Sequence, residues 1–436
     1  MPKGKKKGKY DHRRTEQPYS SDEDAGIDMT IDNCSETSGQ SDLKSNHDDA
    51  ENEIQEKLEE KVLEIIDALS ARANAARAAA LVALRGALQR RYLAALLANH
   101  RATLADHVTR SLRRGKDGEK RAAAGIAPLL ALQIGEEGAE EFLTEVRPAL
   151  AAAAVDKSAS LDTRTECCSS LAALCYLLEE DLSEVIDIMR MYETIFSGSY
   201  LKGDGSVKVS GAVIEEGNWH AAALDGWALL LTLLPAQHAR SLVHSQPPSF
   251  HRLGELLDAA SLEVRMAAGG ALAVAHEWVC GGDEADGREE EAPHVAAVWP
   301  RLERLARDSH KFRAKRDRKL QRATFRDILK YFEEDEVPSV RIRVGAESIA
   351  LETWRAHAAY AALAATLGGG GLTAAAQHSA ALRAALGLAP DLPAQLRLPP
   401  VKLNKLQRHL QNNAACKART VARAKNRDKR SAALAV

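Results

Sequence analysis

Aromatic residues are scarce in this chain of 436 residues, at 4%, and its six cysteines are scattered without a C-x-x-C pair. Aromatic and β-branched residues favour strands, whereas Ala and Leu, which supply most of the apolar residues here, favour helices. The dispersed cysteines indicate neither a disulfide framework nor a zinc site. We therefore expect an all-α protein whose folding does not depend on thiol chemistry.

Long apolar runs and the common catalytic motifs are also missing. The best apolar run, GWALLLTLLPA, is shorter than a membrane span, and the basic start MPKGKKKGKY lacks the apolar core of a secretory signal. The stretches GDGSVKVSG and GGGG lack the Lys-Ser/Thr ending of a phosphate-binding loop, and neither H-E-x-x-H nor G-x-S-x-G occurs. We expect a soluble intracellular protein without enzymatic activity, cofactor, metal, small-molecule substrate or membrane contact.

The first 52 residues hold little that a folded domain could bury. A Lys-rich start is followed by the polar, acidic stretch PYSSDEDAGIDMTIDNCSETSGQSDLKSNHDDAENE. This composition cannot offset the entropy of ordering the chain, so we predict a disordered tail over residues 1–52. Ser20 and Ser21 each precede an acidic residue by three positions (Glu23 and Asp24), which fits either phosphorylation by an acid-directed kinase or a plain solvated tail.

One phrase recurs after the tail. RAAALVAL starts at Arg77, RAAAGIAP at Arg121, RTECCSSL at Arg164 and RMAAGGAL at Arg265, in steps of 44, 43 and 101 residues. The long step has room for one more unit around NWHAAALDGWALLLTLL. Because this is the period of HEAT and armadillo repeats, we predict an armadillo/HEAT-like helical-repeat superhelix of about five repeats over residues 53–305.

The repeats and the rest of the chain are interrupted by glycine, proline and charge. We predict a long loop at GSYLKGDGSVKVSGAVIEEGN and an acidic surface loop near residues 283–292. Residues 306–400 begin with the basic, then amphipathic stretch ARDSHKFRAKRDRKLQRATFRDILKYF. We predict a helical continuation there, broken by the glycine run at 368–371 and by GLAPDLPAQLRLPP. Residues 401–436 form a separate element, predicted to be a basic helix.

This final segment, VKLNKLQRHLQNNAACKARTVARAKNRDKR, is almost free of acids. Its apolar residues recur at a spacing of three and four, which predicts a helix with a narrow apolar stripe and a wide cationic face. A solvated helix normally mixes charge signs, and here Asp428 is the only acid, so the pattern favours a polyanionic ligand. The alternatives are a nuclear import signal and a solvated helix whose stripe docks on the repeats.

Phosphates are the expected target, because no Phe, Tyr or Trp follows Pro400 to stack on bases. A second basic run, in residues 311–322, fits either another phosphate contact or the outer face of a repeat helix. In the C-terminal segment the candidate RNA or phosphate contacts are Lys402, Lys405, Arg408, Lys417, Arg419, Arg423, Lys425, Arg427, Lys429 and Arg430. In the second run they are Lys311, Arg313, Lys315, Arg316, Arg318, Lys319 and Arg322.

Five stretches, taken in order, resemble the motifs of the interferon-related developmental regulator family. They are PYSSDEDA, IFSGSYLK, RMAAGGALAVAHE, HKFRAKRDRKLQRATFRDIL and RHLQNNAACKARTVARAKNRDKR. The resemblance implies an armadillo-like fold, a role as a nuclear transcriptional co-regulator, and binding to translationally idle ribosomes. It also implies that the body covers tRNA sites and that a helix around residues 402–430 lies in the mRNA path. This chain departs from the family in its Ala content, its acidic insert and its glycine run.

Two functions therefore stand as hypotheses. The first is a ribosome- and rRNA-binding factor that represses translation by occupying the tRNA and mRNA sites of idle ribosomes. The alternative is a nuclear adaptor whose concave repeat surface binds transcription factors or deacetylase complexes, with the basic segments serving import. The two roles place the protein in the cytoplasm and the nucleus.

Overall fold

The computed structural model describes residues 45–200, 214–245, 248–280, 286–307 and 315–390, with residues 413, 416, 417, 419–421 and 423 of the C-terminal segment. Residues 1–53 and 54–436 form two separate units. The first helix, α1 (Ser45–Ala68), begins inside the tail that we expect to be disordered, so that expectation is wrong for residues 45–52. Residues 1–44, with Ser20 and Ser21, lie outside the described residues.

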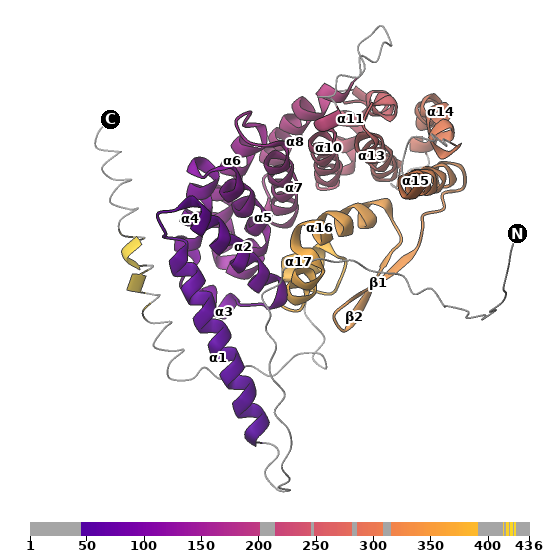
Figure 1. The fold of residues 1–436 in the computed structure, drawn as a ribbon. Helices are drawn as coiled ribbons and strands as arrows, with labels where there is room; N and C mark the ends of the chain where they lie inside the picture. The colour runs from indigo at the N-terminus through magenta and orange to yellow at the C-terminus, as the bar shows by residue number, and fades with distance from the viewer. Residues whose placement is uncertain are drawn as a thin grey trace, which may run out of the picture. The chain divides into compact units, whose positions relative to one another are not determined.

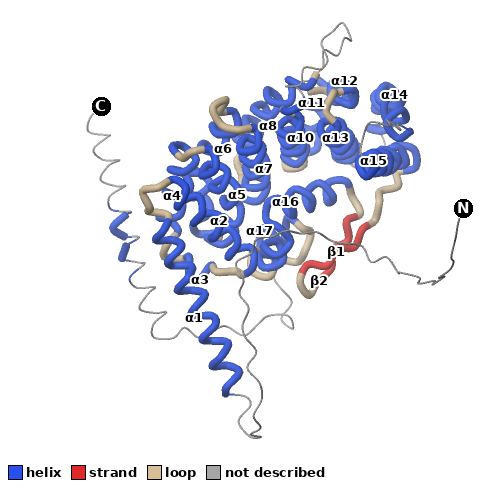
Figure 2. The backbone as a smooth tube through the Cα atoms, viewed as in Figure 1, coloured by secondary structure: helices blue, strands red, loops and turns tan. Residues whose placement is uncertain are grey.

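Five groups of helices follow one another between residues 74 and 307, and they confirm the prediction of an all-α helical-repeat fold (Figures 1 and 2). The four helices that carry the recurring phrases and α10, the additional unit, pack in sequential order, α2 on α5, α5 on α7, α7 on α10 and α10 on α13. We call these five helices the inner row. They are α2 (Asn74–Arg90), α5 (Asp117–Ile134), α7 (Leu161–Leu178), α10 (Gly217–Leu231) and α13 (Leu262–Cys280).

Each inner helix is followed by one or two partner helices. The partners are α4 (Arg101–Arg114), α6 (Glu136–Val155), α8 (Leu182–Phe196), α11 (Ala236–Ser245) with α12 (Phe250–Glu255), and α14 (Asp286–Arg307). Short turns at α3 (Ala94–Leu97), η1 (Ser197–Ser199) and η2 (Leu256–Asp258) join them. The prediction of an acidic loop near 283–292 is wrong for residues 286–292, which form the first turns of α14. Most of the other predicted loop, residues 201–213, lies outside the described residues.

The recurring arginines explain why the inner helices begin alike. The Nη1 atom of Arg77 donates to the carbonyl oxygens of Ala71 and Arg72 at 2.9 Å, and its Nε lies 2.7 Å from the buried Glu119 carboxylate of the next repeat. Arg265 repeats the first contact by donating to the carbonyl of Ala260 at 3.1 Å. Arg77 and Arg265 thus satisfy carbonyls of the loops before their own helices, because buried backbone acceptors need a partner.

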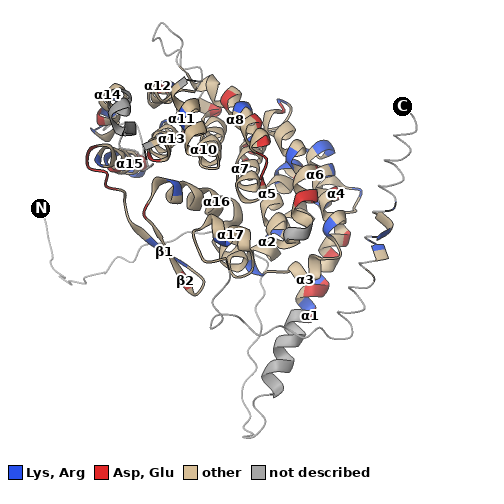
Figure 3. Cartoon of the chain, turned by 180° about the vertical axis from the view of Figure 1, so that it is seen from behind, with Lys and Arg blue, Asp and Glu red and all other residues tan. Residues whose placement is uncertain are grey.

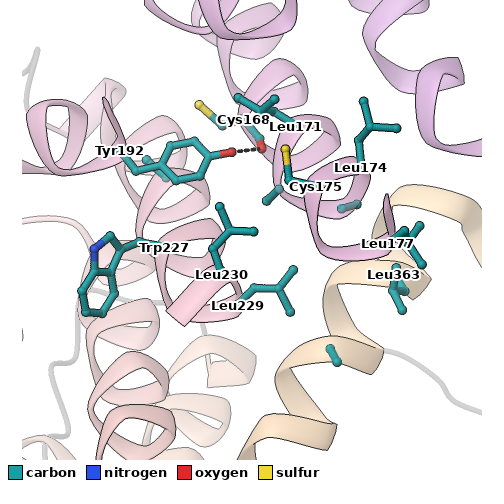
Figure 4. Close-up of a cluster of buried hydrophobic side chains, with 14 of the residues drawn as sticks. Cys168, Leu171, Leu174, Cys175, Leu177, Tyr192, Trp227, Leu229, Leu230 and Leu363 are labelled. Atoms are coloured by element: carbon teal, nitrogen blue, oxygen red, sulfur yellow. Dashed lines mark hydrogen bonds between the residues drawn. The ribbon is translucent and has the colours of Figure 1, made fainter. Parts of the chain in front are cut away.

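The core is made of small and aliphatic side chains that let neighbouring helices approach closely (Figure 4). Leu171 and Leu174 of α7 pack beside Leu229 and Leu230 of α10, and all four are almost fully buried. Tyr192 of α8 is also buried, and its hydroxyl donates to the carbonyl oxygen of Cys168 at 2.8 Å. Such a core stabilises the stack mainly by burying apolar surface between successive repeats.

The chain returns along the inner row after the last repeat. Helix α15 (Lys315–Glu334) packs on α13 and α14, and a hairpin then leads into α16 (Trp354–Ala376), which contacts every helix of the inner row (Figure 1). The short helix α17 (Ala380–Ala385) packs on α16 and α7. The glycine run that we expect to break the helical chain lies inside α16, and the helix kinks there at Gly368, whose φ of 72° and ψ of 153° are not helical, so a break is present at that residue. Residues 391–400 lie outside the described residues.

The hairpin is the one feature of the described residues that the all-α prediction misses. Strand β1 (Val340–Val344) pairs antiparallel with β2 (Glu347–Leu351), in a register that places Val344 opposite Glu347. Two residues therefore make the turn, and the first, Gly345, has a φ of 62°, which glycine adopts without strain. Val344, Ile349 and Leu351 are buried, and both strands contact α16.

Candidate nucleic-acid interface

The C-terminal basic segment is helical at each of its seven described positions. Lys417, Arg419 and Arg423 are exposed there, and Val421, from the predicted apolar stripe, is half-buried. The hydroxyl of Thr420 donates to the carbonyl oxygen of Cys416 one turn earlier, at 3.0 Å. The remaining predicted contacts lie outside the described residues: Lys402, Lys405, Arg408, Lys425, Arg427, Lys429 and Arg430.

This segment lies against the first repeats. The Nζ atom of Lys417 is 3.6 Å from Oδ1 of Asp67, near the end of α1. Arg419 lines a groove of about 300 Å³ that is otherwise formed by the α3–α4 region and by α6. The pKa of His100 is lowered, mainly because the imidazole is buried and secondly because the positive charge of Lys417 is nearby. Figure 3 shows basic and acidic positions side by side around α1, α4 and α6.

The second basic run forms part of α15, and the structure separates its members by the face they occupy. Lys315, Arg316 and Lys319 are exposed, whereas Arg318 and Arg322 are half-buried. The opposite face buries Gln321, Phe325, Ile328 and Tyr331. The run is therefore the outer face of a stacked helix, and three of its cations are exposed. Lys311 and Arg313 lie outside the described residues.

The hairpin carries two arginines that sequence reasoning misses. Arg341 and Arg343 are two residues apart on β1, so they share one face of the hairpin, and both are exposed. Their cross-strand neighbours are the small Ala350 and Ser348. The alternation in VRIRV, followed by glycine and ESIAL, is the signal that could have predicted both the strand pair and its basic face.

The other face of the hairpin is fixed by a buried ion pair. Arg383 of α17 is 1% exposed, and its two terminal nitrogens lie 2.7 and 3.1 Å from the carboxylate oxygens of Glu347 on β2. The hydrogen bonds from Arg383 hold the pKa of this carboxyl below its usual value. Bidentate geometry of this kind orients both partners, so the hairpin is held in one position on α16 and α17.

One buried cluster has the residue types of a nucleophile and a base. The hydroxyl of Ser199 lies 2.7 Å from Nδ1 of His220, whose Nε2 is 3.9 Å from a carboxylate oxygen of Glu216. Both Ser199 and His220 are at most 3% exposed, and burial lowers the pKa of His220 to about 4. The contact joins η1 to α10. A substrate would need access to the serine hydroxyl, and burial denies it in this structure.

The described residues offer no other obvious chemistry. Among them, no group of three or more His, Cys, Asp or Glu side chains is arranged to hold a metal ion. Burial raises the pKa of Cys167 to about 12 and raises those of Cys168 and Cys175 as well, which disfavours thiolate nucleophiles. Within the described ranges, no helix combines the length and apolarity needed to cross a bilayer.

Comparison of the sequence with known proteins identifies its relatives. A family model described as interferon-related developmental regulator matches residues 32–333, and one described as interferon-related protein conserved region matches residues 380–431. Interferon-related developmental regulator 1 of Mus musculus is 35% identical over 428 residues, which cover 96% of this chain and 91% of that protein. Its Homo sapiens counterpart is 34% identical over 425 residues, with the same coverage. Interferon-related developmental regulator 2 of Mus musculus is 35% identical over 382 residues, covering 86% and 84%. These matches confirm the resemblance seen in the motifs: the chain belongs to the interferon-related developmental regulator family.

Proposed function

We propose that this protein is a non-enzymatic regulator that binds messenger-free ribosomes through rRNA phosphates and represses translation. The helical body would cover tRNA sites, and the C-terminal segment would occupy the mRNA path. The observation that carries the proposal is the acid-poor basic segment, in which Lys417, Arg419 and Arg423 are exposed on a helix. Cations without neighbouring aromatic residues suit phosphate contacts, which give affinity with little sequence preference.

Two further basic surfaces support an RNA ligand. The exposed cations of α15 lie on the last repeat, and the paired arginines of β1 lie on a hairpin that the Arg383–Glu347 pair holds in place. Because the repeats pack in series, the body can serve as a rigid platform for contacts at separate points. The proposal places the activity in the cytoplasm.

The test is co-sedimentation with purified messenger-free ribosomes over a salt series. A triple variant, Lys417→Glu, Arg419→Glu and Arg423→Glu, should bind far more weakly than the native chain. The slope of log affinity against log salt should also fall by about 2–3, at about 0.7–0.9 per lost phosphate contact. A matched control reverses three exposed arginines of the body, Arg190, Arg252 and Arg307.

The outcomes separate the proposal from a general charge effect. Weak binding by the C-terminal variant with near-native binding by the control supports the specific role of the segment. If both variants lost the same amount of ribosome affinity, the net charge of the protein would explain the binding without a specific role for the segment. Unchanged sedimentation of the C-terminal variant, with its far-UV circular dichroism intact, would contradict the proposal.

The alternative, a nuclear protein-binding adaptor, meets a structural obstacle. It relies on an open concave surface, and α16 contacts every helix of the inner row. At the start of α16, the Glu277 carboxylate accepts hydrogen bonds from the backbone nitrogens of Trp354 and Arg355 at 2.7 and 2.9 Å. Transcription factors or deacetylase complexes would have to bind another surface, so we favour the RNA-binding role.

A further inference from the structure

Two of the proposed RNA contacts face acidic residues of the protein itself. Lys417 lies 3.6 Å from Asp67 of α1, and Arg419 lines the groove that also contains Glu141 and Glu145 of α6. Opposite charges therefore pair at Lys417 and line the same groove at Arg419. The remaining acids along α1 extend this character, since Glu60 and Glu64 are exposed on the same helix.

The groove has the composition that an arginine side chain requires. Phe142 and Ile134 form apolar parts of its wall together with Ala102 and Ala105. Glu141 and Glu145 supply two carboxylates, and Arg101 supplies one further cation. Arginine buries its methylene stem on apolar surface and keeps its guanidinium among polar groups. Arg419 of the C-terminal segment forms one side of the groove, and Val421, two residues later, is half-buried.

We propose that the C-terminal segment docks on this surface of α1, α4 and α6, through acidic residues of α1 and α6, when no RNA is present, and that RNA phosphates displace it. The inference rests on the proposed function, because the same two cations serve both ligands. Lys417 cannot remain beside Asp67 while it contacts a phosphate, and Arg419 cannot then remain at the edge of the groove. The helical body thus competes with RNA for binding to the C-terminal segment.

Weak docking suits this role. The side chains of Lys417 and Asp67 are 70% and 75% exposed, so water and salt screen their attraction. An exposed ion pair of this kind shifts an equilibrium by about two- to five-fold. A polyanion that offers phosphates to most of the segment overcomes so small a penalty, whereas a ligand with one or two anionic groups gains little. Docking would therefore suppress binding to weak anionic ligands.

Zero-length carbodiimide cross-linking tests the docked state directly. The reagent joins an amine to a carboxylate in contact, so the free full-length protein should yield a Lys417–Asp67 cross-link, detected by peptide mass spectrometry. Lys417→Arg keeps the charge and removes the reactive amine, and it should abolish that product. The pair Lys120 and Asp156, 2.6 Å apart and outside both basic segments, supplies the internal control.

Adding messenger-free ribosomes tests the displacement. Saturating ribosomes should suppress the Lys417–Asp67 product and leave the Lys120–Asp156 product unchanged. In the sedimentation assay Asp67→Asn should tighten ribosome binding about two- to five-fold. Asp187→Asn, at a carboxylate of similar exposure on α8, should leave it unchanged.

Each outcome bears on a different part of the inference. Absence of the Lys417–Asp67 product while the control product forms would overturn docking. Persistence of that product in protein that sediments with ribosomes would overturn displacement. If the protein does not sediment with ribosomes at all, the proposed function and the displacement both fail, while the cross-link in free protein still decides whether the segment docks.

Discussion

The glycine run in α16 provides the sharpest test of how this fold closes its inner face. A methyl group added at Gly370 would lie 2.5 Å from the carbonyl oxygen of Gln89 in α2, whereas one added at Gly369 would meet nothing within 4 Å. Gly368 has a φ of 72° and a ψ of 153°, a region that only glycine occupies readily. Three neighbouring glycines thus differ in what an alanine would cost.

The magnitudes follow from these environments. Gly369→Ala gains helix propensity without a new contact, so it should stabilise the protein by about 0.5–1 kcal/mol. Gly370→Ala gains the same propensity but forces α16 away from α2, and overpacking of this kind costs about 1–3 kcal/mol. The difference between the two variants isolates the close approach, because the propensity gain cancels. Gly368→Ala should be destabilising as well, by about 1–3 kcal/mol of backbone strain.

Urea unfolding, followed by far-UV circular dichroism and tryptophan fluorescence, measures these differences as midpoint shifts at constant slope. Trp354, at the start of α16, makes the fluorescence sensitive to its docking. Equal midpoints for Gly369→Ala and Gly370→Ala would refute the close crossing of α16 and α2. The inner face would then be open at this position, and the adaptor alternative would regain its binding surface.

Three further predictions concern contacts elsewhere in the body. Glu277→Gln should cost about 1–2 kcal/mol, because it removes the negative charge that accepts from two backbone nitrogens at the start of α16, and the urea midpoint should fall. Since burial lowers the pKa of His220 to about 4, the stability it contributes should be complete above pH 6.5 and decline as the pH falls toward 4; His220→Gln should flatten thermal melting midpoints over that range. Arg383→Met should cost on the order of 3 kcal/mol by leaving Glu347 without its partner, and the added Glu347→Gln substitution should restore part of the loss in urea unfolding.

The repeat architecture could be predicted because its signals are local. Four of the five inner helices carry an arginine near their start, and the steps of 44 and 43 residues between the first three give the period. The structure adds the reason: Arg77 and Arg265 bind the carbonyls of the loops before their helices. Because the arginine and the carbonyls that it binds are within six residues of each other, the contact recurs as a local sequence pattern that can be recognised.

The path of α16 could not be predicted, because its partners are distant in sequence. Leu363 and Leu367, four residues apart, and Leu372 are buried; such apolar residues predict burial but not the surface that buries them. The glycines at 368–371 predicted a break, which Gly368 makes as a kink inside α16, but they did not predict the close crossing of α2. Flexible linkers and close helix crossings both favour residues without a side chain, and only the neighbouring backbone of Gln89 distinguishes them.

Charge patterns predicted exposure more reliably than they predicted contacts. The helical period of α15 separates exposed Lys315 and Lys319 from half-buried Arg318 and Arg322, a division that a finer reading of the 3.6-residue spacing would have given. The pairing of Lys417 with Asp67 joins residues far apart in the chain, and no local pattern encodes it. The strand alternation at Arg341 and Arg343 was present but was outweighed by the helical composition.

The contacts of the two basic segments place them at opposite ends of the repeat stack. The C-terminal segment lies against α1, α4 and α6 in the first repeats, and α15 packs on α13 and α14 in the last. Four helix-to-helix steps separate α2 from α13, and at about 8–10 Å a step the row is on the order of 40 Å long. Under the proposed function, phosphate contacts from the displaced C-terminal segment and from α15 reinforce each other only when one ligand reaches both. A large folded RNA meets that condition and a short single strand does not, which favours the proposed ribosomal partner over a generic anionic one.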